Sequence, residues 1–413
     1  MVVHSATLRI NEEMRARRAR GEPVVHLGFG EAGLPVLPEV AEVLRQATGQ
    51  SSYAPVTGST AARSAVAGYL DRRGLPTGPD QVMLAPGSKP LLFGLMTALH
   101  GDVVLPVPSW VSYAAQAALT GKRVVPVPIP AHAGGVPDPD LLPSALADAR
   151  AGGAEPGILI LTLPDNPTGT TADADTVARV CAVAAEHGLA VVADEIYRDL
   201  VDDPGVLVSH AVVLDDRVVV TGGLSKNLAL GGWRIGFART PDTAWGEQLR
   251  DRLVGVASEV WSCTATPMDA VAAYAFDEPD AVTERVAASR RLHLSVSRAM
   301  YDVFADAGAT CRRPTAAFYH YPDVEALRPG FERHGATTAA SAATLLLDRH
   351  GIGVLPGDAF GDDPQALRFR VATSLLYGDG DQRLEALGSD EPAGLPWVTQ
   401  ALDTVRHALK DLG

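Results

Sequence analysis

The sequence predicts an α/β protein with one large, mostly parallel sheet and a second, smaller domain. Between about residues 82 and 237, short apolar runs alternate with helical stretches, a pattern typical of a parallel sheet covered by helices. Polar residues follow the ends of these runs, where open α/β sheets bind ligands. From about residue 280 a long helical pattern leads into strand-like runs, which indicates another domain. The length of 413 residues permits two or three domains.

The elements are expected in the following order. Residues 12–20 form a charged helix and residues 24–27 a short strand. The strands of the large sheet are the apolar runs at residues 82–84, 102–106, 123–127, 158–162, 190–193 and 217–221. An arginine-rich helix near 280–300 precedes strands at 318–322 and 367–371, and a surface insertion at 389–396 precedes a final helix. The predicted domains are a large domain at 46–285 and a small one at 286–413, with residues 1–45 packing on the latter.

Composition excludes several classes of protein. The net charge of -14 comes from 35 basic and 49 acidic residues, and the acids are scattered, which argues against a nucleic-acid partner. No run approaches the roughly 20 apolar residues of a membrane span. The first six residues are no signal peptide, because a charged segment follows. The three cysteines are far apart and form no metal pattern, so we expect no metal site and a cytoplasmic location.

A lysine and an arginine mark the most informative stretch, residues 224–237. Lys226 follows the apolar run at 217–220, and Arg234 lies eight residues later in a glycine-rich turn. Burial lowers the pKa of a lysine, which lets the amine form a Schiff base with an aldehyde. The planar guanidinium of an arginine suits a phosphate. Aldehyde and phosphate are the two ends of pyridoxal 5′-phosphate (PLP). The alternative is a surface lysine followed by a structural arginine.

Two further segments suit the same cofactor. Asp194 ends the apolar run at 190–193, and Tyr197 follows three residues later. A carboxylate beside the pyridine nitrogen keeps the PLP ring protonated and acting as an electron sink, and a phenol can bind the ring's 3′-oxygen. Asn166, after the run at 158–161, could donate to that oxygen. The alternatives are a helix cap for Asp194 and a plain turn around Asn166.

With these motifs, the sequence resembles the class I/II, aspartate-aminotransferase-like family of fold type I PLP enzymes. The resemblance runs from about residue 24 to about residue 373. Eight motifs occur in the family's order: Tyr53, Pro86-Gly87-Ser88-Lys89, Trp110, Asn166-Pro167-Thr168-Gly169, Asp194-Glu195-Ile196-Tyr197, Ser225-Lys226, Gly232-Trp233-Arg234-Ile235-Gly236 and Arg368. It implies the fold type I architecture, a homodimer, and PLP-dependent transfer of an amino group between an L-amino acid and a 2-oxo acid.

The resemblance implies a role for each cofactor residue. Lys226 would carry PLP as an imine and move the substrate's proton, while Asp194 would pair with the ring nitrogen. Tyr197 and Asn166 would hold the 3′-oxygen. The remaining residues would hold the phosphate and the ring: Gly87, Ser88, Lys89, Trp110, Ser225 and Arg234. Tyr53 would reach the phosphate bound to the partner subunit.

The resemblance also implies how the substrate is held. Arg368 would bind its α-carboxylate as a bidentate pair, and the backbone of Gly30 would approach the same group. The rest of the pocket would be lined by Phe29, Trp110, Glu259, Trp261 and Phe318. Aromatic surface with one negative charge favours a neutral or cationic amino donor over aspartate or glutamate.

Departures from the family pattern keep other functions open. Gly223 replaces a usual serine or threonine, Asp165 replaces a usual asparagine, and Gly30-Glu31-Ala32-Gly33 replaces Gly-Glu-Pro-Asp. One alternative is a PLP enzyme of specialised metabolism that performs oxidative deamination, decarboxylation-coupled deamination, elimination or hydroxylation. A remoter one is a PLP-sensing regulator, although only about 25 residues precede the first family-like strand, too few for a DNA-binding domain.

Other motifs in the sequence carry less weight. Residues 28–33 match G-x-G-x-x-G, but two prolines follow where a dinucleotide site needs a helix, so we expect no NAD. The spacing of Asp358, Asp362 and Asp363 does not fit a calcium loop. His26 and His320 are isolated, which favours structural roles over metal binding.

Overall fold

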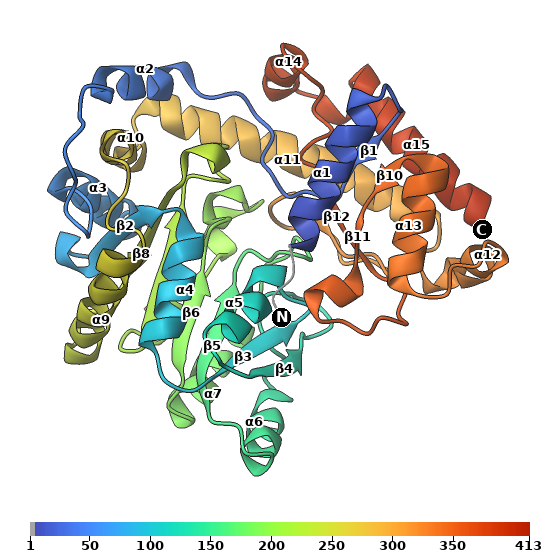
Figure 1. Cartoon of the computed structure of the whole chain (residues 1–413). Helices are drawn as coiled ribbons and strands as arrows, with labels where there is room; N and C mark the ends of the chain where they lie inside the picture. The colour runs from blue at the N-terminus through green and yellow to red at the C-terminus, as the bar shows by residue number, and fades with distance from the viewer. Residues whose placement is uncertain (1–4) are drawn as a thin grey trace.

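The computed structural model describes residues 5–413 of the chain. The prediction that residues 1–6 start no signal peptide falls mainly on residues 1–4, which lie outside this range. Within it, the strands form one seven-stranded sheet and two small sheets. Figure 1 shows the large sheet with its helices on one side of the molecule and the C-terminal elements, in orange and red, on the other.

The large sheet is parallel apart from one strand. Its order in space is β2 (Val82–Pro86), β8 (Ile235–Arg239), β7 (Val218–Gly223), β6 (Ala190–Asp194), β5 (Pro156–Thr162), β3 (Asp102–Val107) and β4 (Val124–Pro128). β8 runs antiparallel to both of its neighbours. The six predicted strands are confirmed to within a few residues, whereas β8 was not predicted. The α/β class and the mostly parallel sheet are therefore confirmed.

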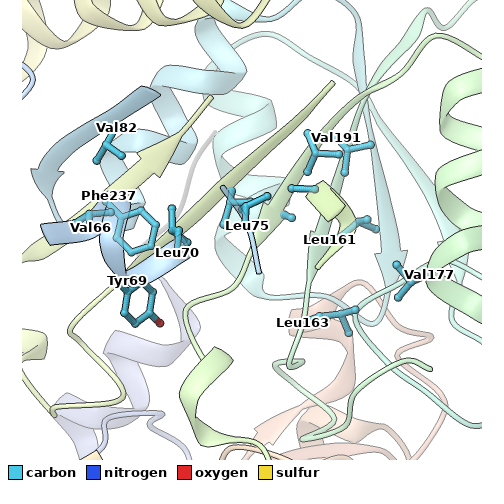
Figure 2. Packing of buried hydrophobic residues seen from close by; sticks show 14 of the residues in the cluster. Val66, Tyr69, Leu70, Leu75, Val82, Leu161, Leu163, Val177, Val191 and Phe237 are labelled. Carbon is cyan, nitrogen blue, oxygen red and sulfur yellow. The ribbon is translucent and has the colours of Figure 1, made fainter. Parts of the chain in front are cut away.

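Alternate side chains of the strands enter two different cores. In β5, Ile158 and Ile160 belong to one core, while Leu159 and Leu161 belong to the other. Successive side chains of a strand point to opposite faces, so a strand that is covered on both faces must be apolar at nearly every position. Figure 2 shows the second of these cores, where Leu161 lies near Val177 and Val191.

Helices cover both faces of this sheet. One face packs against α3 (Thr60–Asp71), α6 (Leu142–Ala151), α7 (Ala174–Glu186), α8 (His210–Val213) and α10 (Thr266–Asp277). The other packs against α4 (Ser88–Ala98), α5 (Val111–Leu119) and α9 (Ala244–Val260). Side-chain caps fix two of the starts: Ser59 accepts from the amide of Ala62, and Asp173 accepts from the amide of Thr176.

The C-terminal elements form a smaller body with the start of the chain. Its strands are β1 (Val25–His26) beside β10 (Ile352–Gly353), and β11 (Leu355–Pro356), β12 (Phe369–Ala372) and β9 (Tyr319–His320) in that order. Its helices are α1 (Ala6–Ala19), α11 (Asp280–Asp306), α12 (Arg328–Arg333), α13 (Ala339–His350), α14 (Gln382–Gly388) and α15 (Pro396–Leu412). α1 contacts β11 and lies across this body in Figure 1. The helix predicted near 280–300 is confirmed and extends further.

The chain crosses from one body to the other near its start. Val25 and Leu27 pack in the core of the smaller body, but Val40 of α2 (Pro38–Ala47) packs in a core of the large sheet. The predicted limit at residue 45 falls inside α2, and the three predicted domain ranges remain a prediction. None of the helices within residues 5–413 is long and apolar enough to cross a membrane.

Candidate active site

Most of the predicted site residues line one cavity of about 510 Å³. They come from the loops that follow β2, β3, β5, β6 and β7, because parallel strands end at the same edge of a sheet. These residues are Ser88, Lys89, Trp110, Asn166, Asp194, Tyr197, Ser225, Lys226 and Arg234, and Gly30 lines the cavity from the entrance loop. Tyr53, Gly87 and Arg368 do not line it.

Lys226 enters the cavity from the loop after β7. Its neighbour Asn227 fixes this loop by donating to Asp199, 2.8 Å away. The Lys226 Nζ donates to the carbonyl oxygen of Gly30 at 2.5 Å. Burial, helped by the nearby Arg370 guanidinium, lowers the pKa of this amine to about 8. The amine can therefore lose its proton near neutral pH and act as a nucleophile.

The buried carboxylate of Asp194 lines the same cavity. The side chain ends β6 and is 2% exposed. Its Oδ2 accepts from the Tyr113 hydroxyl at 2.9 Å, whereas its Oδ1 has no hydrogen-bond partner among residues 5–413. Burial raises the pKa of this carboxyl to about 6, against the hydrogen bond from Tyr113. A buried carboxylate without a full set of partners is costly, so a ligand N–H would stabilise it here.

Polar side chains form a chain along one wall of the cavity. The hydroxyls of Tyr197 and Tyr319 lie 2.7 Å apart. Asn166 donates to the Tyr197 hydroxyl at 3.5 Å and accepts from Arg370 at 3.4 Å. Burial raises the pKa of Tyr197 well above its usual value, which keeps the phenol protonated and able to donate.

The start of α4 forms an anion site with Arg234. Gly87 precedes this helix with φ of 90°, and a Cβ at this position would lie 2.1 Å from Arg234 Nη2. A glycine is therefore required for the guanidinium to lie over the helix N-terminus, where an anion is favoured. The Lys89 Nζ lies 4.9 Å from the centroid of the Trp110 ring. Partial burial and the charge of Arg234 lower the pKa of Lys89.

The cavity thus combines an amine of lowered pKa, a buried carboxylate with one oxygen that lacks a hydrogen-bond partner among residues 5–413, and a helix N-terminus beside Arg234. The profile of the family described as aminotransferase class I and II matches residues 22–375. The chain belongs to this family. Like the rest of the family it is an enzyme of fold type I, and its substrates are amino and oxo acids.

Relatives of known name match this aminotransferase over most of its length. A bifunctional aspartate aminotransferase and glutamate/aspartate-prephenate aminotransferase of Petunia hybrida is 30% identical, over 90% of this chain and 78% of its own. An aspartate aminotransferase of Geobacillus stearothermophilus is 29% identical, over 90% and 92%. The solved aspartate aminotransferase of Thermus thermophilus with maleate superimposes with a TM-score of 0.81 at 27% identity, over 94% and 96%.

The structure of the aminotransferase corrects the predicted substrate arginine. Arg368 lies outside the cavity, where Asp323 and Asp362 pair with it at 2.9 and 3.1 Å. Arg370 lines the cavity instead, is 1% exposed, and donates to the carbonyl oxygen of Gly28 at 2.5 Å. β12 begins only at Phe369, so Arg368 falls at the outer end of the strand beside the two acids. The spacing of the two arginines does not reveal this in the sequence.

The predicted lining of the substrate pocket is also partly wrong. Phe29 and Trp110 line the cavity, but Glu259, Trp261 and Phe318 do not. Trp261 packs in the core beneath α4 and α9, and Phe318 is fully buried in a cluster with Tyr197 and Tyr319. In their place, one face of α1 lines the cavity with Thr7, Leu8, Asn11 and Arg15. The argument for a neutral or cationic amino donor therefore loses its structural basis.

Several residues of the site were not predicted. Tyr113 follows Trp110 by three residues, one helical turn, and Tyr319 lies in a predicted strand, so local signals existed for both. Thr162, which lies 2.7 Å from the Tyr113 hydroxyl, ends a predicted strand. No pattern in the sequence indicated that α1 lines the cavity, because only contacts with distant parts of the chain bring the helix there.

Proposed function

We propose that this aminotransferase uses PLP held by Lys226, and that Arg370 binds the α-carboxylate of its substrates. One observation carries the proposal: Lys226, whose amine has a lowered pKa, and Asp194, whose buried Oδ1 has no hydrogen-bond partner among residues 5–413, line the same cavity. A surface lysine with a structural arginine nearby does not account for both features. The reaction we propose is transfer of an amino group between an L-amino acid and a 2-oxo acid.

The residues present fit each part of PLP. Asp194 Oδ1 suits a protonated ring nitrogen, and the donors Tyr197 and Asn166 suit the 3′-oxygen. Trp110 suits the ring face. The phosphate fits the site formed by Arg234, Ser225 and the α4 N-terminus at Ser88. When bound, PLP supplies an electron sink for bond cleavage at the substrate's α-carbon.

The side chains of this chain would then perform the remaining tasks. Lys226 Nζ, once the substrate's amino group takes its place, would be the base that accepts the α-proton and holds it for return. Arg370 is buried and no carboxylate among the described residues pairs with it, so it holds the substrate's carboxylate in a fixed orientation. Asp194 keeps a proton on the ring nitrogen through electrostatic attraction. Gly30, whose backbone approaches Lys226, lines the entrance.

Amino transfer is favoured over the alternatives that the sequence left open. The relatives are named as aminotransferases and cover about nine-tenths of this chain, which supports neither a different fate of the amino acid nor a regulator. We further propose a homodimer, supported by the exposure of Tyr53, and a cytoplasmic location, supported by three cysteines that are all free thiols.

Chemical labelling of Lys226 tests the proposal. The purified protein should be yellow, and borohydride should fix a phosphopyridoxyl group on Lys226, identified by mass spectrometry of its peptide. Lys226→Ala should remove the label, while the matched variant Lys89→Ala should keep it. A label on Lys89, or well-folded protein that binds no PLP, would show that the proposal is wrong.

A further inference from the structure

A single carboxylate joins the two loops that carry central side chains of the site. Asp199 lies two residues after Tyr197, in the loop that follows β6. Its Oδ2 accepts a hydrogen bond of 2.8 Å from the side-chain amide of Asn227, the residue next to Lys226 in the loop that follows β7. β6 and β7 are paired neighbours in the sheet, so this bond ties together the loops after two adjacent strands.

Asp199 is itself held by residues at the end of α3. The hydroxyl of Tyr69, a residue of the core in Figure 2, donates to its Oδ2 at 2.9 Å. Arg73 donates to its Oδ1 from Nη2 at 2.8 Å and from Nε at 3.1 Å, and also pairs with Glu278, just after α10, at 2.5 Å. The Asp199 side chain is 9% exposed, and hydrogen bonds between charged groups are about twice as strong as neutral ones. The carboxylate therefore has a fixed position.

Asn227 connects this fixed carboxylate to the lysine loop. Its side-chain nitrogen donates to Asp199, while its side-chain oxygen accepts from the backbone amide of Leu228 at 2.9 Å. The cavity left between Asp199 and Asn227 measures only about 10 Å³, so the loop has little room to shift. Neither residue lines the active-site cavity, so an effect on the chemistry has to be transmitted through their neighbours.

We propose that Asp199 is a positioning residue that acts through Asn227 to hold the Lys226 amine in place. The Lys226 Nζ lies 5.8 Å from the centroid of the Tyr197 ring, and these two side chains come from the two loops that Asp199 joins. A reacting group displaced by about 1 Å can lose about a hundredfold in rate, so a loop that carries a base must be fixed. The inference rests on the proposed function, in which Lys226 combines with PLP and moves the substrate's proton.

A double-mutant cycle tests this link. Stopped-flow absorbance measures how fast the cofactor-free protein combines with PLP. We expect Asn227→Ala and Asp199→Asn each to react about tenfold more slowly than wild type, because a displaced amine meets the aldehyde less often. The double variant should be no slower than the slower single variant, since both changes remove the same contact. Losses that add, or a wild-type rate in Asn227→Ala, would overturn the proposal.

Arg72→Gln is the matched control. Arg72 donates to Glu278 at 2.8 Å, at the outer end of the same group of charges, but within residues 5–413 it forms neither a hydrogen bond nor an ion pair with Asp199. The variant should combine with PLP as wild type does, even where it lowers the melting temperature. An equal slowing in Arg72→Gln would indicate a general loss of stability and overturn the proposal. If Asp199→Asn does not fold, Asn227→Ala decides alone.

The pKa of the Lys226 amine gives a readout that needs neither PLP nor turnover. Reductive methylation of the cofactor-free protein over a series of pH values measures it, with the modified lysine identified by mass spectrometry. Burial lowers this pKa to about 8 in wild type, and in Asn227→Ala it should rise toward the ordinary value of about 10.4, because the freed amine enters water. Arg72→Gln should keep the wild-type value. The charged residues that act on this pKa are unchanged in both variants: Arg370, Glu31, Arg234 and Asp194.

The two measurements separate this inference from the proposed function. If wild type does not combine with PLP at Lys226, the proposed function is wrong, and the methylation series still decides whether the contact between Asp199 and Asn227 fixes the amine. If wild type combines with PLP but Asn227→Ala keeps the wild-type rate and pKa, the proposed function stands and Asp199 is not a positioning residue.

Discussion

Arg368 and Arg370 lie two residues apart, but their surroundings differ, and this decides which guanidinium is available to a ligand. Arg368 is matched by two acids, so its charge is neutralised within the chain. Arg370 is almost completely buried, its Nε has no partner among residues 5–413, and burial lowers its pKa. Its charge also helps to lower the pKa of Lys226. A substrate carboxylate bound to Arg370 would give the guanidinium a charged partner. It would also reduce the effect of the guanidinium on the pKa of Lys226.

Conservative variants of the two arginines separate their roles. Arg370→Lys should lower kcat/KM for alanine about a hundredfold, or about 2.7 kcal/mol, because lysine cannot form the planar bidentate pair in a buried site. Arg368→Lys, the matched control, should change it by less than about threefold, because Arg368 lies outside the cavity and lysine keeps the charge that pairs with Asp323 and Asp362. Single-turnover kinetics with alanine measure both. A larger loss in Arg368→Lys would restore the original sequence prediction.

Asp194 should make the cofactor-free protein less stable as the pH rises. Burial raises its folded-state pKa to about 6, above the unfolded value of about 3.9. Such a group stabilises the fold only when protonated, so this contribution is complete below about pH 4 and is lost as the pH rises through 6. The free energy of unfolding of wild type, relative to Asp194→Asn, should fall by about 2–3 kcal/mol over this range. Urea unfolding of both cofactor-free proteins measures the difference, and a flat profile would contradict the raised pKa.

At the scale of elements, the sequence predicted the large sheet well because its strands are buried on both faces. β5 and β6 are apolar at nearly every position, which leaves little choice of structure. The proposed cofactor residues could be predicted for the same reason, since they come just after strand ends and parallel strands end together. β8 was not predicted, because its residues, Ile235–Arg239, come directly after a turn motif. Only their pairing with β2 and β7 defines them as a strand.

Helix α1 shows why the substrate side of the site could not be predicted. Its sequence is mostly polar and only Met14 is buried, so no apolar face indicates where it packs. Its place depends on contacts with β1 and β10, more than ten and more than 300 residues away. The sequence also could not show that Trp261 and Glu259 lie outside the cavity lining, because this depends on how α9 packs against α4. Local patterns predict what an element is, but not which distant element it meets.

At the scale of the whole molecule, the cavity is formed by three distant parts of the chain. The large sheet supplies Lys226 and Asp194, the smaller body supplies Arg370, and the entrance is formed by α1 and the loop at Gly30. The proposed cofactor residues therefore belong to one body, while the proposed substrate residues belong to the other. A movement of the smaller body relative to the large sheet would therefore alter the proposed substrate site and leave the proposed cofactor site intact.

The exposure of Tyr53 supports the proposed homodimer. Its side chain is 91% exposed, yet its neighbours are fixed: Thr266 donates to the Ser52 carbonyl oxygen at 2.5 Å, and the Ser59 amide donates to Asp269 at 2.6 Å. A large aromatic side chain held in solvent by an anchored loop is typical of a contact with another subunit. The family resemblance assigns that contact to the phosphate of the partner's PLP.

The loss of one hydroxyl tests this assembly. Tyr53→Phe should weaken PLP binding by about 0.5–1.5 kcal/mol, the usual contribution of one hydrogen bond, and leave the dimer intact. Tyr301→Phe, a half-buried tyrosine on α11, is the matched control and should bind PLP as wild type does. Equilibrium dialysis measures the affinity, and light scattering at the same concentrations measures the mass. Because Tyr53 lies outside the cavity of its own chain, its effect on PLP requires a second subunit. A monomer that binds PLP with undiminished affinity at high dilution would therefore show that the active site is complete within one chain.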